Sequence, residues 1–335
     1  MLLWTNGSAR AAETAPPSAS PAREYLRVLY YREGKSARAS FLGHPKSVDV
    51  FAPQSYSINR SGSLAGRVDP ALLTFARKNG IKVMPLVTNR GFDREQTQIF
   101  LMRPAKQDAA IRALIREAEK NTFWGWQFDF EQIDVSYRDR YSAFIRKAGA
   151  ELKKSNFAMS VAVMAQVSTN PGDYPNTLWQ DVIGVYDYRA LAASTDFVSV
   201  MSYDDPGSKG PIARYSWLQQ VIAHGLKFIP SEKLSLGIPF YYWKWDDGRG
   251  KIVGIGGYEG IQMLRERHFL TAGYSEEEQA PFLQYATSKK RYTIWYENGK
   301  SVQRKLDLVT ANGLHGFSAW ALGLETPDIH PVLQE

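Results

Sequence analysis

Two acidic residues stand two positions apart at the end of an aromatic-rich segment, Phe123-Trp124-Gly125-Trp126-Gln127-Phe128-Asp129-Phe130-Glu131. The segment has the length and composition of a β-strand. Because side chains alternate across a strand, Gln127, Asp129 and Glu131 share one face, and the aromatic residues between them share the other. The aromatic face suits a covering layer of helices, whereas a plain core would not bury the polar face.

The pair of carboxyls has the makings of an acid catalyst. A spacing of two residues in a strand places the backbones of Asp129 and Glu131 about 6.5–7 Å apart. Two carboxyls this close cannot both ionise freely, so one pKa is raised. A protonated Glu131 can donate a proton, while an ionised Asp129 can orient a group or stabilise positive charge. The same pattern also fits a strand end with two solvated acids.

The rest of the chain indicates how this strand is held. Segments of strand character alternate with helices along residues 25–335, which predicts one closed parallel (β/α)8 barrel, the TIM barrel, as the catalytic domain. The predicted strands are 25–31, 48–57, 81–87, 123–131, 157–164, 197–204, 233–241 and 316–322, and the predicted helices begin at 69–70 and cover 108–121, 138–154, 186–193, 216–225 and 301–312.

Two parts of the chain depart from this alternation. Residues 246–297, approximately, contain Gly-rich turns, a helix near 258–267 and short strands, which predicts a small α+β insertion between barrel strands 7 and 8. Residues 1–24 combine a short apolar start with small residues and resemble a truncated secretory signal or a disordered lead-in. A secreted or periplasmic location is the expectation, with a cytoplasmic protein as the alternative.

Further polar and aromatic groups end the other predicted strands. In a barrel of this kind, chemistry sits at the carboxyl ends of the strands, so these side chains are expected to meet Asp129 and Glu131 at one mouth. Tyrosine hydroxyls and carboxylates bind sugar hydroxyls, and an indole ring stacks on the face of a sugar. The expected members of this sugar-binding set are Tyr203, Asp204, Tyr241, Tyr242 and Trp320, together with Gln127 of the fourth strand.

Composition excludes several other functions. The formal net charge of +7 is scattered along the chain, so no nucleic-acid-binding stripe is predicted. The chain has no cysteine, and its five histidines are far apart in sequence, so no metal site is expected. No apolar run approaches the length of a membrane span.

The strand motifs resemble those of glycoside hydrolase family 18, the chitinase family. Its fourth-strand motif, Asp-Gly-x-Asp-x-Asp-x-Glu, aligns with residues 124–131. Resemblance extends over roughly residues 25–330 and looks closest to the bacterial spore-cortex and cell-wall N-acetylglucosaminidase branch, from Tyr186-Asp187-Tyr188 and the stretch 320–324. The other matching motifs are Met201-Ser202-Tyr203-Asp204, Gly237-Ile238-Pro239-Phe240-Tyr241 and Gly316-Phe317-Ser318-Ala319-Trp320.

The resemblance implies hydrolysis of β-1,4-linked N-acetylglucosamine glycans, in chitin oligomers or peptidoglycan, without metal or organic cofactor. The mechanism it implies is retaining and substrate-assisted: Glu131 protonates the leaving oxygen, and the substrate's own acetamide attacks the anomeric carbon. Asp129 then orients the acetamide and Tyr203 hydrogen-bonds it. Asp204 and Trp320 bind the sugar.

The sequence departs from the family motif at two positions, where Trp124 and Gln127 replace aspartates. Gln127 is able to hydrogen-bond Asp129 but not to share a proton with it as an acid. An alternative follows: a catalytically weak or inactive chitinase-like lectin that binds sugar without cleaving it. Retention of Glu131 favours the enzyme.

Overall fold

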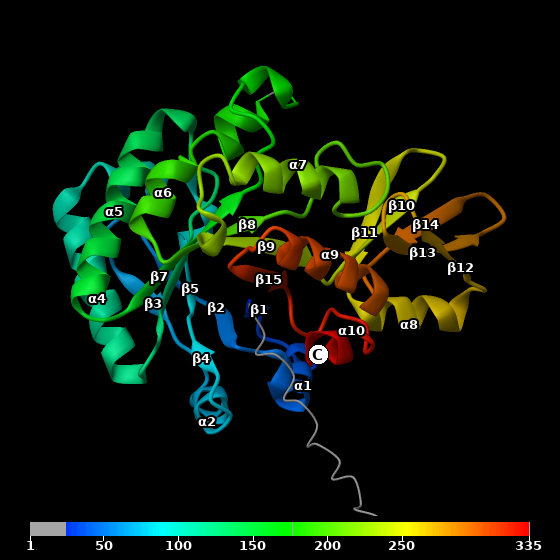
Figure 1. The fold of residues 1–335 in the computed structure, drawn as a ribbon, viewed down its shortest axis with the longest axis horizontal. Helices are drawn as coiled ribbons and strands as arrows, with labels where there is room; N and C mark the ends of the chain where they lie inside the picture. Colours follow the sequence, from blue (N-terminus) through cyan, green and yellow to red (C-terminus); the bar gives the residue numbers. More distant parts are fainter. Residues whose placement is uncertain (1–24, 176, 335) are drawn as a thin grey trace, which may run out of the picture.

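The computed structural model describes residues 25–175 and 177–334, so the predicted signal-like lead-in lies outside the described residues. A closed barrel of parallel strands forms the centre of the molecule, with helices around it (Figure 1). Its strands are β1 (Leu26–Tyr31), β2 (Val50–Ile58), β4 (Lys82–Val83) with β5 (Leu86–Asn89), β6 (Gly125–Asp129), β7 (Ala158–Met164), β8 (Phe197–Met201), β9 (Leu234–Pro239) and β15 (Gly316–Trp320).

The strand pairings confirm the predicted (β/α)8 architecture. Neighbours follow the order β1-β15-β9-β8-β7-β6-β5-β2, and β1 also pairs with β2, which closes the ring. The predicted third strand is split into β4 and β5 around Met84-Pro85. Proline has no N–H to donate to a ladder, so a break there has a simple cause. A short strand, β3 (Leu64–Gly66), adds antiparallel to the end of β2.

Helix boundaries follow the capping signals in the sequence. α2 begins at Pro70 after the N-cap Asp69, whose side chain accepts a hydrogen bond from the Ala71 N–H at 2.8 Å, and it ends before Gly80 with a φ of +68°. The outer helices are α1 (Lys35–Gly43), α2 (Pro70–Lys78), α3 (Arg94–Leu101), α4 (Pro104–Asn121), α5 (Arg138–Lys154), α6 (Tyr188–Ser194), α7 (Tyr215–Gly225), α9 (Gly299–Ala311) and α10 (Ile329–Gln334).

Strand β6 has the two faces that the alternation predicts. Trp126 is fully buried against the helix layer, and its indole N–H donates to the Leu114 carbonyl of α4 at 3.1 Å. Phe128 packs edge-on against Phe144 of α5. At the start of the strand, a Cβ on Gly125 would lie 1.9 Å from the Ala158 carbonyl oxygen. Only glycine therefore lets β6 and β7 approach this closely.

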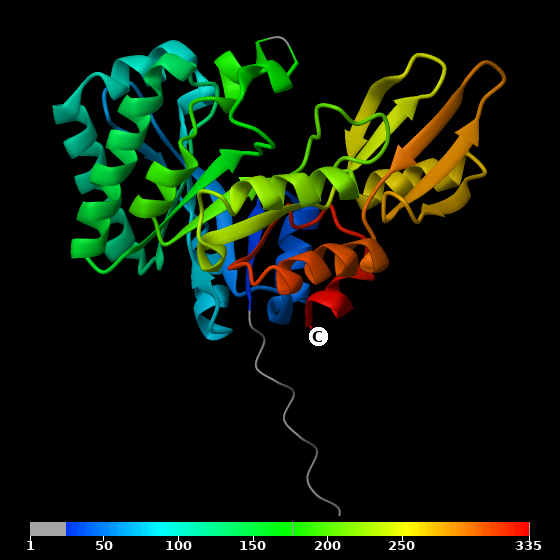
Figure 2. The ribbon, with the colours of Figure 1, turned by 45° about the horizontal axis from the view of Figure 1, so that its top comes forward.

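The segment of the chain that connects β9 to β15, where the insertion is predicted, forms a second, antiparallel sheet. This sheet projects to one side of the barrel (Figure 2). Its strands follow the order β11-β10-β14-β13-β12, and the sheet begins at Tyr242 rather than near residue 246. The elements are β10 (Tyr242–Asp246), β11 (Lys251–Gly256), α8 (Tyr258–Arg267), β12 (Thr271–Ser275), β13 (Ala280–Ala286) and β14 (Arg291–Trp295).

Candidate active site

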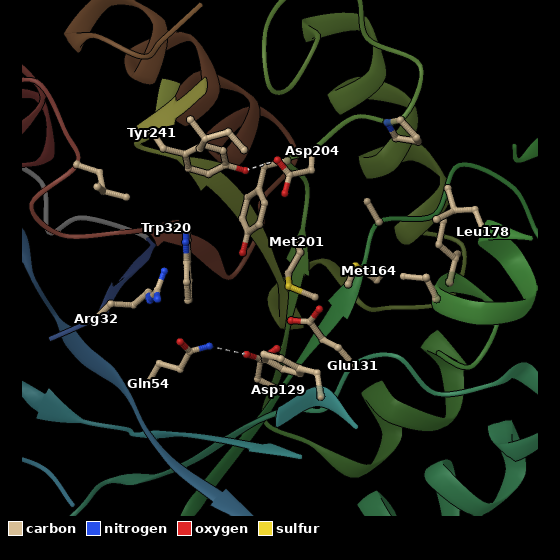
Figure 3. A pocket seen from close by; sticks show the side chains of 18 of the residues that line it. Arg32, Gln54, Asp129, Glu131, Met164, Leu178, Met201, Asp204, Tyr241 and Trp320 are labelled. Atoms are coloured by element: carbon tan, nitrogen blue, oxygen red, sulfur yellow. Dashed lines mark hydrogen bonds between the residues drawn. The ribbon is translucent and has the colours of Figure 1, made fainter. Parts of the chain in front are cut away.

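A pocket of about 670 Å³ opens at the carboxyl ends of the barrel strands, and Figure 3 shows the residues that line it. Its volume falls in the range typical of small-ligand sites. The segment around Leu178 and Ile183 forms one wall, and Ile255 and Gly256 of β11 contribute to the lining from the insertion. The predicted site residues that line it are Asp129, Glu131, Tyr203, Asp204, Tyr241 and Trp320.

Asp129 and Glu131 lie next to each other in this pocket (Figure 3). Burial raises the pKa of both carboxyls, and the neighbouring Asp129 raises the pKa of Glu131 further. If both were ionised, the buried Asp129 Oδ1 would have no donor. A proton held on Glu131 supplies that donor through a carboxyl–carboxylate hydrogen bond. The pair is therefore arranged as an acid beside a carboxylate, as the sequence spacing predicts.

The backbone of Glu131 is held by a side chain from the neighbouring strand. The Glu131 N–H donates to Asn89 Oδ1 at 2.9 Å, and Asn89 Nδ2 donates to the Glu131 carbonyl at 2.9 Å. Asn89 is itself buried at the end of β5, where its Nδ2 also contacts the Thr97 hydroxyl. Glu131 follows the end of β6, and these two hydrogen bonds to Asn89 fix its backbone in place of helix or strand hydrogen bonds.

Asp204 and two tyrosines form a second group beside the pair. The Tyr241 hydroxyl donates to Asp204 Oδ1 at 2.6 Å, and the Tyr241 ring packs edge-on against Tyr203. Burial raises the pKa of Asp204, while the hydrogen bond from Tyr241 lowers it. Asp204 has a φ of +57°, a conformation that non-glycine residues rarely adopt, and it directs the carboxylate away from the end of β8. The group offers an oriented carboxylate to a polar ligand.

Trp320 supplies an aromatic surface at the end of β15. Its half-buried ring packs against Tyr30, with 5.4 Å between ring centroids. Tyr30 is fixed within the barrel interior, so the indole has a firm support on one side and the pocket on the other. A flat, supported indole is the surface on which a sugar ring stacks.

Gln127 lies deeper in the barrel than the pocket. It is fully buried, and its side-chain amide nitrogen, Nε2, donates to the hydroxyls of Ser160 and Ser199 at 2.8 and 2.9 Å. These bonds replace the expected hydrogen bond to Asp129, which instead has a long contact of 3.5 Å from Gln54 Nε2. Gln127 is not among the residues that line the pocket.

Two other singled-out aromatic residues also lie outside the pocket lining. Tyr242 opens β10 and packs with Ile261 and Leu283 in the insertion, not among the pocket residues. Trp124 precedes β6 at the opposite end from Glu131, where its ring stacks near Phe197 and the Lys82 ammonium lies 4.5 Å from its centroid. The Trp124 departure from the motif thus changes the base of the barrel, not its mouth.

Several pocket residues escaped the sequence reasoning. Arg32 follows the last residue of β1, so the rule that chemistry gathers at strand ends could have found it, whereas Gln54 lies in the middle of β2, just beyond the level at which β1 ends. The apolar lining has no comparable signal, because loops and the insertion bring it together. Its members include Phe92, Met164, Leu178, Met201, Trp217 and Ile255.

Residues 25–175 and 177–334 contain neither a candidate metal cluster nor a candidate membrane-spanning helix. No group of three or more His, Cys, Asp or Glu side chains there is placed to hold a metal ion. No helix in the same ranges is long and apolar enough to cross a membrane.

The family model of the glycosyl hydrolases family 18 matches residues 40–325. The chain belongs to this family. Among curated relatives, the uncharacterized glycosylase YvbX of Bacillus subtilis is 25% identical over 344 residues, covering all of this chain and 94% of that protein. The cortical fragment-lytic enzyme of B. subtilis is 25% identical, and the match covers 82% of this chain but only 64% of that enzyme.

Solved structures of family 18 proteins share the fold. The spore cortex-lytic enzyme SleL of Bacillus megaterium superposes with a TM-score of 0.83 at 23% identity, over 94% of this chain and 75% of that one. A chitinase from Chromobacterium violaceum superposes with a TM-score of 0.81 at 26% identity, over 92% and 98%. With its family and fold, the chain is a glycoside hydrolase related to chitinases and cortex-lytic enzymes.

Proposed function

We propose that this family 18 hydrolase cleaves β-1,4-linked glycans containing N-acetylglucosamine by a retaining, substrate-assisted mechanism. The observation that carries the proposal is the adjacent pair of Asp129 and Glu131 in the pocket, where burial and the neighbouring Asp129 raise the pKa of Glu131. One acid and one adjacent carboxylate fit a reaction in which the enzyme supplies the proton and the substrate supplies the nucleophile.

The roles follow from the positions of the side chains. A sugar stacked on Trp320 presents its glycosidic oxygen to Glu131, which protonates it as the bond to the anomeric carbon breaks. The acetamide oxygen of the same sugar closes on that carbon, and the positive charge that develops lies near ionised Asp129. Water then opens the cyclic intermediate, with Glu131 accepting its proton, and the anomeric configuration is retained.

The second group in the pocket holds the substrate for this step. In the proposed complex, Tyr203 hydrogen-bonds the acetamide, while Asp204, fixed by Tyr241, accepts hydrogen bonds from sugar hydroxyls. Such contacts restrict the sugar to the geometry in which the acetamide reaches the anomeric carbon. Gln127 supports the site from below through the Ser160 and Ser199 hydroxyls.

Product analysis by mass spectrometry, with proton NMR of the freshly released sugars to read their anomeric configuration, tests the proposal. Wild type, Glu131→Gln and Asp129→Asn are incubated with N-acetylglucosamine oligomers and with purified peptidoglycan. Wild type is expected to release products with the β configuration, and either variant is expected to lose about 10²–10⁴-fold in rate, the usual contribution of a positioned acid. Exposed Glu119→Gln serves as the charge-matched control. Turnover unaffected by Glu131→Gln, or products of the α configuration, would contradict the mechanism.

A further inference from the structure

Arg32 follows β1 directly and lines the pocket. Figure 3 draws its guanidinium group on the side of the Trp320 ring away from Glu131, and the two residues stand at the ends of neighbouring strands, since β1 pairs with β15. The side chain is exposed, and within the described parts of the chain it has neither an ion-pair partner nor a hydrogen-bond partner. A free cation therefore stands in a pocket whose other charged groups are acids.

Other arginines close to the mouth are already engaged. Arg94 pairs with Asp181 at 2.8 Å, next to the wall segment around Leu178. Arg214 pairs with the buried Asp205 at 2.5 Å, one residue after Asp204. These two guanidinium groups hold loops in place, whereas Arg32 has its hydrogen-bond donors available. A guanidinium group matches a carboxylate with two parallel hydrogen bonds, so a carboxylate is the ligand group that it suits best.

The location of Arg32 relative to Trp320 indicates which part of a substrate it meets. The proposed function places the reacting sugar over Trp320 with its glycosidic bond at Glu131. Arg32 lines the same pocket but is drawn on the far side of Trp320 from Glu131, so it is closer to the sugar that precedes the reacting one than to the bond that is cleaved. A carboxylate on that adjacent sugar would meet Arg32 without approaching Asp129 or Asp204, which would repel it.

We propose that Arg32 binds a carboxylate on the sugar adjacent to the reacting N-acetylglucosamine, which makes an anionic glycan of the peptidoglycan type the preferred substrate over neutral chitin. The inference rests on the proposed function for the placement of the reacting sugar. In a polymer that alternates N-acetylglucosamine with N-acetylmuramic acid, both neighbours of each N-acetylglucosamine carry a 3-O-lactyl group. The proposed mechanism fixes the direction of the chain, because the glycosidic bond of the reacting sugar lies at Glu131, so Arg32 meets the lactyl group of the neighbour on the other side of that sugar.

The carboxylate has two possible sources in such a polymer. In strands without peptides, the lactyl group ends in a free carboxylate. Where a stem peptide is attached, that carboxyl is an uncharged amide, and the nearest negative charges belong to the peptide. Both present the same chemistry to Arg32, and matched oligosaccharides distinguish them.

Binding measured in a Glu131→Gln background tests the inference without turnover. Calorimetry compares a peptide-free alternating tetrasaccharide, its form with the lactyl carboxylates converted to methyl amides, a peptide-bearing form and the chitin tetrasaccharide. We expect the carboxylated form to bind more tightly than its methyl amide. Adding Arg32→Gln is expected to reduce that ratio of affinities about tenfold or more, as for a charge-assisted hydrogen bond, and Arg32→Lys to restore part of it.

Lys35→Gln is the matched control, because Lys35 is an exposed cation three positions along the chain and outside the pocket lining. It is expected to leave the ratio unchanged. Dependence on Arg32 confined to the peptide-bearing form supports the inference and assigns the carboxylate to the stem peptide. Equal affinity for the carboxylate and its methyl amide, together with binding of the peptide-bearing form that is insensitive to Arg32→Gln, overturns it. Absence of cleavage by wild type contradicts the proposed function, whereas these binding ratios judge Arg32 separately.

Discussion

Glu131 keeps its proton because its carboxyl is buried beside Asp129, and both causes raise its pKa. The folded protein therefore holds this proton up to a higher pH than the unfolded chain does. The contribution of Glu131 to stability is complete below the unfolded carboxyl pKa of about 4.3 and is lost as the pH rises through the higher folded pKa. The acid of the proposed mechanism thus makes the fold less stable under alkaline conditions.

A stability measurement across pH checks this sign. Glu131→Gln stays neutral at every pH and can still donate to Asp129, so its free energy of unfolding is expected to exceed that of wild type at alkaline pH and to match it near about pH 4. The difference should grow by about 1.4 kcal/mol for each pH unit between the unfolded and folded pKa values. Urea unfolding of both proteins at several pH values measures it. A gap that does not change with pH would show that Glu131 is not the group that retains the proton.

The sequence predicted the positions of individual residues in strands better than it predicted their hydrogen-bond partners. The predicted alternation places Asp129 and Glu131 on one face, and both line the pocket, although β6 ends at Asp129 and Asn89 holds Glu131 beyond it. It did not reveal that Gln127 bonds to Ser160 and Ser199, because those partners are 33 and 72 residues away. Arg32 directly follows the first strand, so the strand-end rule could have found it, but no pattern in the sequence shows that this cation lacks a partner.

Strand ends are joined by side chains as well as by the sheet ladder, and Asn89 is the clearest example. It leaves β5 and clasps both backbone polar groups of Glu131, beyond the last residue of β6. Asn89 is a positioning residue in the proposed mechanism, because it fixes the acid without being a lining residue of the pocket.

Asn89→Ala is expected to lower kcat about 10- to 100-fold with a smaller change in KM, since misplacing a catalytic group by about 1 Å costs on the order of 10²-fold. Steady-state kinetics on an N-acetylglucosamine oligomer, with the pH profile, measures both constants. Asn312→Ala is the control, because Asn312 makes a similar bond to the Leu308 carbonyl at the end of α9, outside the pocket lining. A purely structural role would lower the melting temperature and leave kcat of the folded fraction intact.

Elements with a local signal were predicted well. The Asp69-Pro70 start and Asn79-Gly80 stop of α2 are encoded by neighbouring residues, and the structure confirms them. α3 was not predicted, and α4 begins at Pro104 rather than near residue 108. α3 is short, with only three buried residues, so its apolar stripe gives a weak pattern.

The barrel and the inserted sheet are joined by a buried ion pair. Lys305 of α9 and Glu297, which follows β14, are fully buried and lie 2.7 Å apart. The Glu297 carbonyl also accepts a hydrogen bond from the Thr326 hydroxyl, after β15. The return of the chain from the insertion is thereby fixed to the helix layer of the barrel.

Breaking this pair from one side should be costly. Lys305→Met leaves the Glu297 carboxylate buried without its cation, and we expect a loss of about 3–5 kcal/mol in the free energy of unfolding. The double variant Lys305→Met/Glu297→Gln is expected to recover much of that loss. Chemical unfolding of the two variants and wild type measures both terms. A single variant as stable as wild type would show that the pair does not secure the insertion.

The inserted sheet leaves the barrel after β9 and rejoins it before β15, and these two strands pair with each other in register. Deleting the sheet between β9 and β15 would not alter the segment that carries Asp129 and Glu131. It would remove Ile255 and Gly256 from the pocket lining. The sheet is therefore a unit that can be exchanged by protein engineering. Replacing it with the corresponding segment of a relative would change one wall of the pocket and leave Asp129 and Glu131 in position. The part of the chain that could alter the preference for a glycan, the inserted sheet, is therefore separate from the part that carries Glu131.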